Sequence, residues 1–206
     1  MSHRKAIHSH YEPRITPARE NYDVLDWASA ASQQARFKVL ADQVPLEGRS
    51  LLDVGCGLGD LHAYLAARKI AVRYTGVDLI EKMVAAARQR HPGVRFVRGD
   101  IFAEPVLAGE KFDRVFCSGT FNLNLGNNRL FLPQAIGRLF ELTNEYVVFN
   151  LLHHRARGDD PRYAYYDPAD VSAILAKFPC EVRILDDYLP NDFTVICRST
   201  GAAAGG

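Results

Sequence analysis

Three features are scarce in this chain: cysteine, long apolar runs and an excess of charge of either sign. The 206 residues include only four cysteines, which lie far apart and form no Cys-x-x-Cys pair. This spacing predicts neither a disulfide framework nor a zinc site, so we expect reduced, mostly buried thiols and no metal.

No apolar run approaches the roughly 20 residues that a membrane-spanning helix needs. The start of the chain is polar and lacks the apolar stretch of a secretory signal. We therefore expect a cytoplasmic protein without membrane contact. Lysine and arginine total 25 against 24 for aspartate and glutamate, a net charge of +1. A chain this close to neutrality has no broad basic surface, so nucleic acid is not an expected partner.

Strand-like and helix-like segments alternate along the chain, and the length fits one domain. Strands are expected at residues 50–54, 73–78, 94–98, 112–117, 145–150, 181–187 and 193–198. Helices are expected at residues 26–44, 58–68, 81–90, 129–142 and 168–177. Such alternation builds a parallel sheet with helices on both faces. The last two strands are joined by a turn too short for a crossover helix, so they should pair antiparallel. The predicted fold class is α/β: a doubly wound, seven-stranded, mostly parallel sheet with a C-terminal antiparallel hairpin.

The most informative segment follows the first expected strand, where residues 53–60 read Asp-Val-Gly-Cys-Gly-Leu-Gly-Asp. A strand that enters a helix through a glycine turn is where open α/β proteins bind nucleotide-like ligands. The dinucleotide fingerprint would place a third glycine or alanine at position 60, but this chain has Asp60. Together with Asp53 at the strand end, that acid disfavours an anionic pyrophosphate.

Asp53 followed by Gly55, Gly57 and Gly59 resembles the first motif of the class I S-adenosylmethionine (SAM) dependent methyltransferases. SAM carries a sulfonium and an ammonium, so nearby carboxylates suit it electrostatically. The resemblance covers about residues 50–199. It implies a Rossmann-like methyltransferase fold, SAM as cofactor, S-adenosylhomocysteine as product and an activity of the EC 2.1.1 class.

Acids also follow the next two expected strands. Asp78 can accept hydrogen bonds from both ribose hydroxyls, although an acid in that place is equally typical of a helix cap. The family places an acid beside the adenine amine and an apolar residue against the ring, which correspond here to Asp100 and Ile101. An Asx turn is the alternative interpretation of Asp100. The resemblance implies the following cofactor-binding residues: Asp53, Gly55, Cys56, Gly57, Gly59, Asp78, Leu79, Met83, Asp100, Ile101, Cys117, Ser118, Gly119, Tyr11, Arg14 and Trp27.

The N-terminal segment is expected to cover the site. Residues 1–45 form an arm and helix that act as a lid over the cofactor, residues 46–200 form the SAM-binding methyltransferase domain, and residues 201–206 form a disordered tail. A hydroxyl or guanidinium of the arm would contact the cofactor carboxylate, and an aromatic face would lie near the sulfonium. Packed aromatics and solvated charges are the alternative. Trp27, Gln33 and the pair Arg36-Phe37 resemble the N-terminal signature of one group of small bacterial methyltransferases.

The expected reaction is an in-line transfer of the methyl group to an oxygen or nitrogen atom of a small molecule. This chemistry depends mainly on alignment of the acceptor and exclusion of water. His153 and His154 follow the fifth strand and are the candidate catalytic bases, with a solvent-exposed loop as the alternative. Three other functions stay open: a peptide or protein methyltransferase, a non-catalytic SAM- or S-adenosylhomocysteine-binding protein, and an NAD-linked oxidoreductase. The protein is expected to be a monomer or homodimer.

Overall fold

The computed structural model describes residues 3–16, 18–156, 158 and 160–201. Its strands form one seven-stranded sheet in the order β3-β2-β1-β4-β5-β7-β6. The strands are β1 (Ser50–Val54), β2 (Arg73–Asp78), β3 (Arg95–Arg98), β4 (Phe112–Cys117), β5 (Thr143–Leu152), β6 (Cys180–Leu185) and β7 (Asp192–Ser199). The first five strands pair with one another in parallel, whereas β7 is antiparallel to both β5 and β6. The predicted fold class is therefore confirmed.

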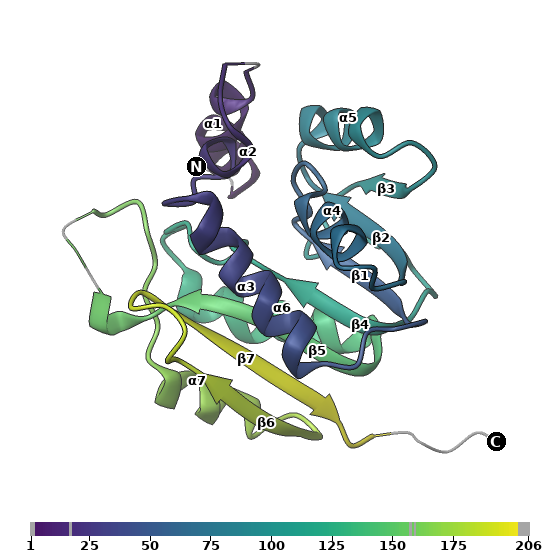
Figure 1. Ribbon diagram of the computed structural model, residues 1–206. Coiled ribbons are helices and arrows are strands. Elements are labelled where there is room, and N and C mark those ends of the chain that lie inside the picture. Colours follow the sequence, from purple (N-terminus) through teal and green to yellow (C-terminus); the bar gives the residue numbers. More distant parts are fainter. Residues whose placement is uncertain (1–2, 17, 157, 159, 202–206) are drawn as a thin grey trace.

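Helices cover both faces of the sheet, with α3 in front and α6 behind in Figure 1. The helices are α1 (His3–Tyr11), α2 (Asn21–Val24), α3 (Ala30–Gln43), α4 (Asp60–Ala67), α5 (Glu81–Arg90), α6 (Asn128–Glu141) and α7 (Pro168–Leu175), with short 3-10 turns η1 (Glu12–Arg14) and η2 (His154–Ala156). None of the helices among the described residues is both long and apolar enough to cross a membrane.

The two core layers follow from the alternation of side chains along the strands. Leu51 and Leu52 of β1 are both fully buried, but they belong to different apolar clusters. Leu52 lies in the cluster that includes Ile136 of α6, and Leu51 in the cluster that includes Leu40 of α3. A strand that is buried on both faces in this way has near-continuous apolar sequence, which is why the sequence pattern identified it.

The N-terminal segment differs from the expectation in two ways. The arm contains helix α1, which the sequence did not predict and which has no buried residue. Helix α3 begins at Ala30 and not at residue 26, because Asp26 has a φ of 62° and Ser29 caps the helix. The Ser29 hydroxyl accepts a hydrogen bond from the Ser32 amide at 3.1 Å, and the Ser32 hydroxyl accepts one from the Ser29 amide, which together form a capping box. Of the predicted disordered tail, all but Gly201 lies outside the described residues.

Candidate active site

A cavity of about 680 Å³ lies where β1, β2, β3 and β4 end and the N-terminal arm covers them. The carboxyl edge of a parallel sheet is the usual ligand site of open α/β folds. Twelve of the predicted cofactor residues line this cavity: Tyr11, Trp27, Asp53, Gly55, Cys56, Asp78, Leu79, Met83, Asp100, Ile101, Ser118 and Gly119. The volume falls within the range typical of small-molecule sites.

Asp53 is a buried carboxyl at the floor of the cavity, with 4% of its surface exposed. The Tyr74 hydroxyl donates a hydrogen bond to its Oδ2 at 2.6 Å. Burial raises the pKa of Asp53 to about 7, against the lowering effect of that hydrogen bond, and the negative charges of Asp78 and Asp60 add to the rise. No lysine or arginine among the described residues forms an ion pair with Asp53, so the site favours a ligand that brings a positive charge.

Asp78 is held rigidly by the glycine turn. Its Oδ2 accepts a hydrogen bond from the Gly57 amide at 2.9 Å, and its Oδ1 accepts one from the Ile80 amide at 2.8 Å. Burial raises the pKa of Asp78, and these backbone bonds oppose the rise. Gly57 therefore contributes to the site by fixing Asp78, although neither it nor Gly59 lines the cavity.

Asp100 joins the end of β3 to the arm. Its Oδ1 accepts a hydrogen bond from the Phe102 amide at 3.0 Å, which is the Asx-type contact expected as the alternative. Its Oδ2 accepts a second bond from Arg4 Nε at 3.2 Å. Arg4 also pairs with Glu104 at 2.5 Å. Through Arg4, helix α1 lies against the third-strand end of the cavity.

Two glycines allow close packing of side chains at the site. At Gly55, which has a φ of 74°, a Cβ would lie 2.4 Å from Thr120 Oγ1. At Gly119, which has a φ of 75°, a Cβ would lie 2.8 Å from the Trp27 ring. The Trp27 indole therefore rests on the backbone that follows β4, a contact that only glycine permits.

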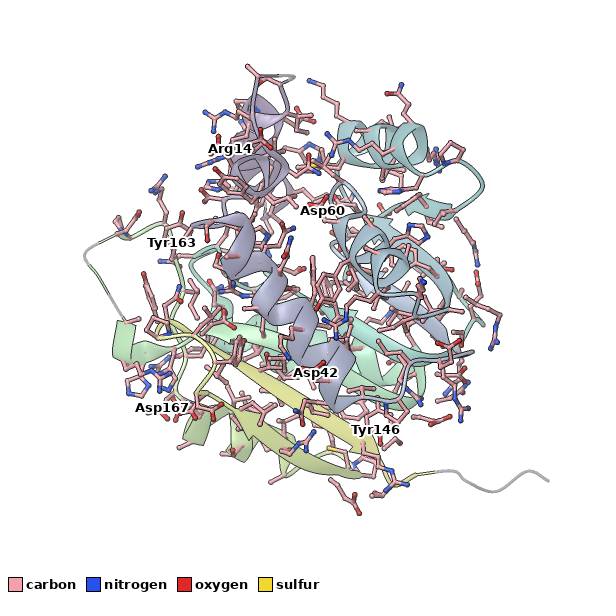
Figure 2. All side chains as sticks on the ribbon, viewed as in Figure 1. Arg14, Asp42, Asp60, Tyr146, Tyr163 and Asp167 are labelled. Carbon is pink, nitrogen blue, oxygen red and sulfur yellow. The ribbon has the colours of Figure 1, made fainter. Side chains whose placement is uncertain are left out.

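Asp60 is a further acid of the cavity, at the first position of α4. It accepts hydrogen bonds from Asn21 Nδ2 at 2.6 Å and from Gln33 Nε2 at 2.9 Å. Figure 2 shows Asp60 between the arm and α4. Two neutral amides thus tie the arm to α4 and leave the negative charge of Asp60 without a cationic partner among the described residues.

The comparisons with known proteins agree on one family. Residues 51–141 match the family model described as a methyltransferase domain. Trans-aconitate 2-methyltransferase of Paracidovorax citrulli is 33% identical over 101 residues, which are 48% of this chain and 38% of that protein. Malonyl-[acyl-carrier protein] O-methyltransferase of Acetivibrio thermocellus is 31% identical over 163 residues, 74% of this chain and 54% of that protein. The chain thus spans about half or less of the length of these relatives.

Solved structures show the same fold. Magnesium protoporphyrin IX methyltransferase (ChlM) of Synechocystis PCC 6803 with bound S-adenosylhomocysteine has a TM-score of 0.68 and 18% identity, covering 93% of this chain and 94% of that one. The CcbJ methyltransferase of Streptomyces caelestis has a TM-score of 0.69 and 18% identity, covering 87% and 96%. Together, the domain match, the relatives and the shared fold support a class I SAM-dependent methyltransferase. The resemblance stated from the glycine motif is thereby confirmed.

The structure brings together most, but not all, of the residues that the methyltransferase resemblance implied. Cys117 is fully buried in the core and does not line the cavity. Arg14 does not line the cavity either. Its guanidinium lies 2.7 Å from Asp26 Oδ1 and donates to the Asp23 carbonyl at 3.2 Å. A contact between Arg14 and the carboxylate of a methyl donor is therefore not supported by this geometry.

His153 and His154 do not line the cavity. His153 has 5% of its surface exposed, its Nδ1 accepts a hydrogen bond from the Arg155 amide at 3.2 Å, and its ring packs against Phe193 at 5.4 Å. Burial lowers the pKa of His153. Their role as bases stays a prediction, and the geometry does not support it.

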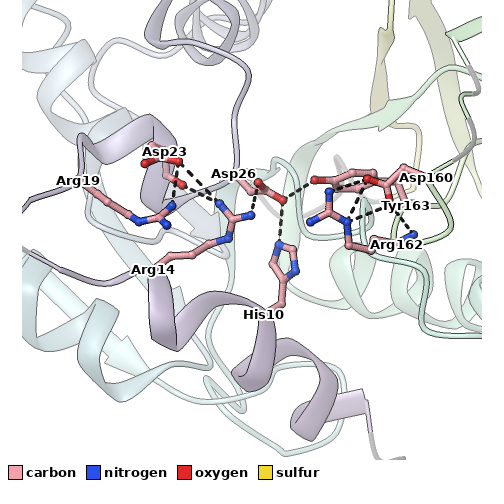
Figure 3. A network of polar contacts seen from close by, with 8 residues as sticks. All are labelled: His10, Arg14, Arg19, Asp23, Asp26, Asp160, Arg162 and Tyr163. Carbon is pink, nitrogen blue, oxygen red and sulfur yellow. Dashed lines mark hydrogen bonds and ion pairs between the residues drawn. The ribbon is translucent and has the colours of Figure 1, made fainter.

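Asp26 is a polar link that the sequence did not reveal. Its Oδ2 accepts a hydrogen bond from the Tyr163 hydroxyl at 2.6 Å and also lies 2.8 Å from His10 Nε2. Its Oδ1 forms an ion pair with Arg14 (Figure 3). Burial alone would raise the pKa of Asp26, but the bonds from His10 and Tyr163 and the charge of Arg14 outweigh it and hold the pKa at about 2. Asp26 thus connects the arm to the segment that follows β5.

Arg36 of α3 links the N-terminal segment to Asp192 of β7. It is buried, and its Nε and Nη2 donate to Asp192 Oδ2 at 3.0 and 2.6 Å. Asn150 donates to the same carboxylate at 3.0 Å. The guanidinium lies 4.3 Å from the centre of the Trp27 ring, within cation–π range. The sequence identified Arg36 only as part of the N-terminal signature, and its partner Asp192 lies 156 residues away.

Proposed function

We propose that the protein binds SAM in this cavity and transfers its methyl group to an oxygen or nitrogen atom of a small molecule. The observation that carries the proposal is the set of four carboxylates in one cavity: Asp53, Asp60, Asp78 and Asp100. Such a set favours a ligand that carries positive charge and hydroxyl or amine donors. ChlM, which has the same fold, was crystallised with SAM and with S-adenosylhomocysteine.

The residues present fit this ligand. The rigid carboxylate of Asp78 suits a pair of ribose hydroxyls. Asp100 suits the adenine amine, with Ile101 against the ring, once Arg4 shares or releases it. Asp53 suits the ammonium group. The buried Ser118 hydroxyl, which lines the cavity, has no hydrogen-bond partner among the described residues and is free to bind a polar ligand atom.

When bound, SAM would supply a methyl group attached to a positively charged sulfur. Because that sulfur leaves as a neutral thioether, the transfer needs neither a metal nor a covalent enzyme intermediate. The contribution of this chain is then to align the acceptor and exclude water. Helix α1 and Trp27 form the wall that closes the cavity from the arm side. Tyr11 belongs to that wall, and burial raises the pKa of its hydroxyl well above the usual value. The hydroxyl therefore stays protonated and available as a donor.

Calorimetric titration with SAM, S-adenosylhomocysteine and NAD tests the cofactor. We expect SAM and its product to bind and NAD to bind at least tenfold more weakly, because Asp53 and Asp60 would face its pyrophosphate. Asp78→Asn should weaken SAM binding, whereas Asp42→Asn should not, since Asp42 lies at the far end of α3 outside the cavity (Figure 2). Tighter binding of NAD would contradict the proposal.

Release of S-adenosylhomocysteine in the presence of a metabolite library tests the transfer itself. We expect turnover with at least one small molecule. Turnover only with peptides or proteins would replace the small-molecule acceptor by a macromolecular one. Tight SAM binding without turnover on either class would identify a non-catalytic SAM-binding protein.

A further inference from the structure

The cavity has an apolar half beyond its four carboxylates. This half is formed by the segment that follows β4 and by the first turns of α6, through Leu123, Leu125, Leu130 and Phe131. Leu130 lines the cavity and yet has 74% of its surface exposed, so it stands at the mouth. An apolar side chain at the rim of an apolar cavity is typical of a site where an apolar molecule enters.

The charges that line the cavity are mostly of one sign. Four aspartates face it, while Arg4 is its only lysine or arginine among the described residues. Arg4 is already paired with Asp100 at 3.2 Å and Glu104 at 2.5 Å. SAM carries a net charge of about +1, from a sulfonium, an ammonium and a carboxylate, and so does not balance Asp53, Asp60 and Asp78, the three carboxylates that have no lysine or arginine partner among the described residues. A second anion placed beside it would lack a partner, which costs several kcal/mol when the anion is buried.

We propose that the methyl acceptor is an uncharged or cationic molecule with an apolar body that contacts Leu130 and Phe131, and not a carboxylic acid. This inference rests on the proposed function and specifies its substrate class. In the transfer, a lone pair on an alcohol oxygen, or on an amine nitrogen that has first given up its proton to bulk water, forms the new bond to the methyl carbon. The electron pair of the carbon–sulfur bond stays on sulfur, and an alcohol acceptor gives up its proton to bulk water. Asn127 and Gln134, which also line the cavity, supply neutral hydrogen-bonding groups near the apolar wall.

The preference for uncharged or cationic acceptors is tested by measuring how acceptor analogues bind to the protein saturated with S-adenosylhomocysteine. The probes are amines, alcohols and carboxylic acids built on the same phenylalkyl and naphthylalkyl bodies, together with the tricarboxylate trans-aconitate. We expect amines or alcohols to bind at least tenfold more tightly than the matched acids and trans-aconitate. Equal or tighter binding of the acids, or no binding by any member of the panel, would overturn the proposal.

Two substitutions test the apolar mouth with the best acceptor found. Leu130→Ser should raise the KM for that acceptor at least fivefold and leave SAM affinity unchanged. Val182→Ser is the matched control, because Val182 is an exposed apolar residue of β6 outside the cavity, and it should change neither value. Gln134→Lys should improve the binding of the acids by placing a cation at the apolar wall. An unchanged KM in Leu130→Ser would refute the proposed contact.

These tests separate the inference from the function on which it rests. Absence of SAM binding would end the proposed function. SAM binding and turnover with a preference for carboxylic acids would leave that function intact and contradict the substrate class alone.

Discussion

Asp53 gives the sharpest prediction, a pH dependence of cofactor binding. Its pKa of about 7 in the free protein means that about half of the molecules carry the charge at pH 7 and about one in a hundred at pH 5. A cationic ligand binds the ionised form, so the pKa of Asp53 falls in the complex. Affinity should therefore decline as the pH falls below 7, by about fifty-fold between pH 7 and pH 5 if the pKa in the complex lies well below 5.

Trp27 provides the assay, since it is the only tryptophan of the chain and lines the cavity. Its fluorescence should report the binding of S-adenosylhomocysteine at each pH. Asp53→Asn should bind more weakly at pH 7 and show a much flatter dependence, while Asp42→Asn should keep the wild-type curve. Tyr74→Phe should move the curve to higher pH, because loss of its hydrogen bond raises the pKa of Asp53 further. An Asp53→Asn curve parallel to that of the wild type would refute the reasoning.

Three further predictions concern stability and the arm. The free wild-type protein should lose stability relative to Asp53→Asn as the pH rises from about 4 to about 7. The reason is that the raised pKa of Asp53 makes the folded state favour the protonated acid. Thermal unfolding of both proteins at pH 5 and pH 8 shows whether the difference in stability changes in this direction. Tyr163→Phe should weaken S-adenosylhomocysteine binding several-fold by freeing the arm from the segment after β5, and unchanged binding would reject that link. Asp192→Ala should cost about 3–5 kcal/mol in denaturant unfolding because it leaves Arg36 buried without its partner, and a loss below about 1 kcal/mol would show that the pair contributes little.

The sequence predicted the sheet and its carboxyl edge well, for a clear physical reason. Buried parallel strands have continuous apolar runs, and the acids that follow them stand out against that background. Asp53, Asp78 and Asp100 were found in this way, and the short turn before β7 identified the antiparallel hairpin. Local pattern was enough at each of these positions.

The arm could not be predicted as well, because its order depends on distant contacts. Helix α1 has no fully buried residue, and only the partly buried Ile7 and Tyr11 pack against the core, so its apolar pattern is too short to predict a helix. Its position rests on pairs such as Arg4 with Asp100, which are 96 residues apart, and on Asp26 with Tyr163, which are 137 apart. Single-sequence reasoning contains no signal for such pairs, although Tyr11, one of the predicted site residues, does line the cavity.

The histidines show where the strand-end rule stops applying. The rule places a ligand beyond the carboxyl ends of the parallel strands. Strand β5 stands at the border of the parallel region, pairs with the antiparallel β7 and runs to Leu152, two residues past the expected end. His153 consequently packs against Phe193 of β7 and lies outside the cavity.

Binding of SAM in the cavity is measured by adding SAM to the intact protein at pH 7.5 and following calorimetry and Trp27 fluorescence, with NAD as the competing ligand. The four carboxylates of the cavity predict saturable binding of SAM with a change in Trp27 emission, and displacement of no more than about a tenth of the bound SAM by an equal concentration of NAD. Absence of SAM binding, or displacement of most of the SAM by an equal concentration of NAD, would contradict the assignment of this cavity to SAM.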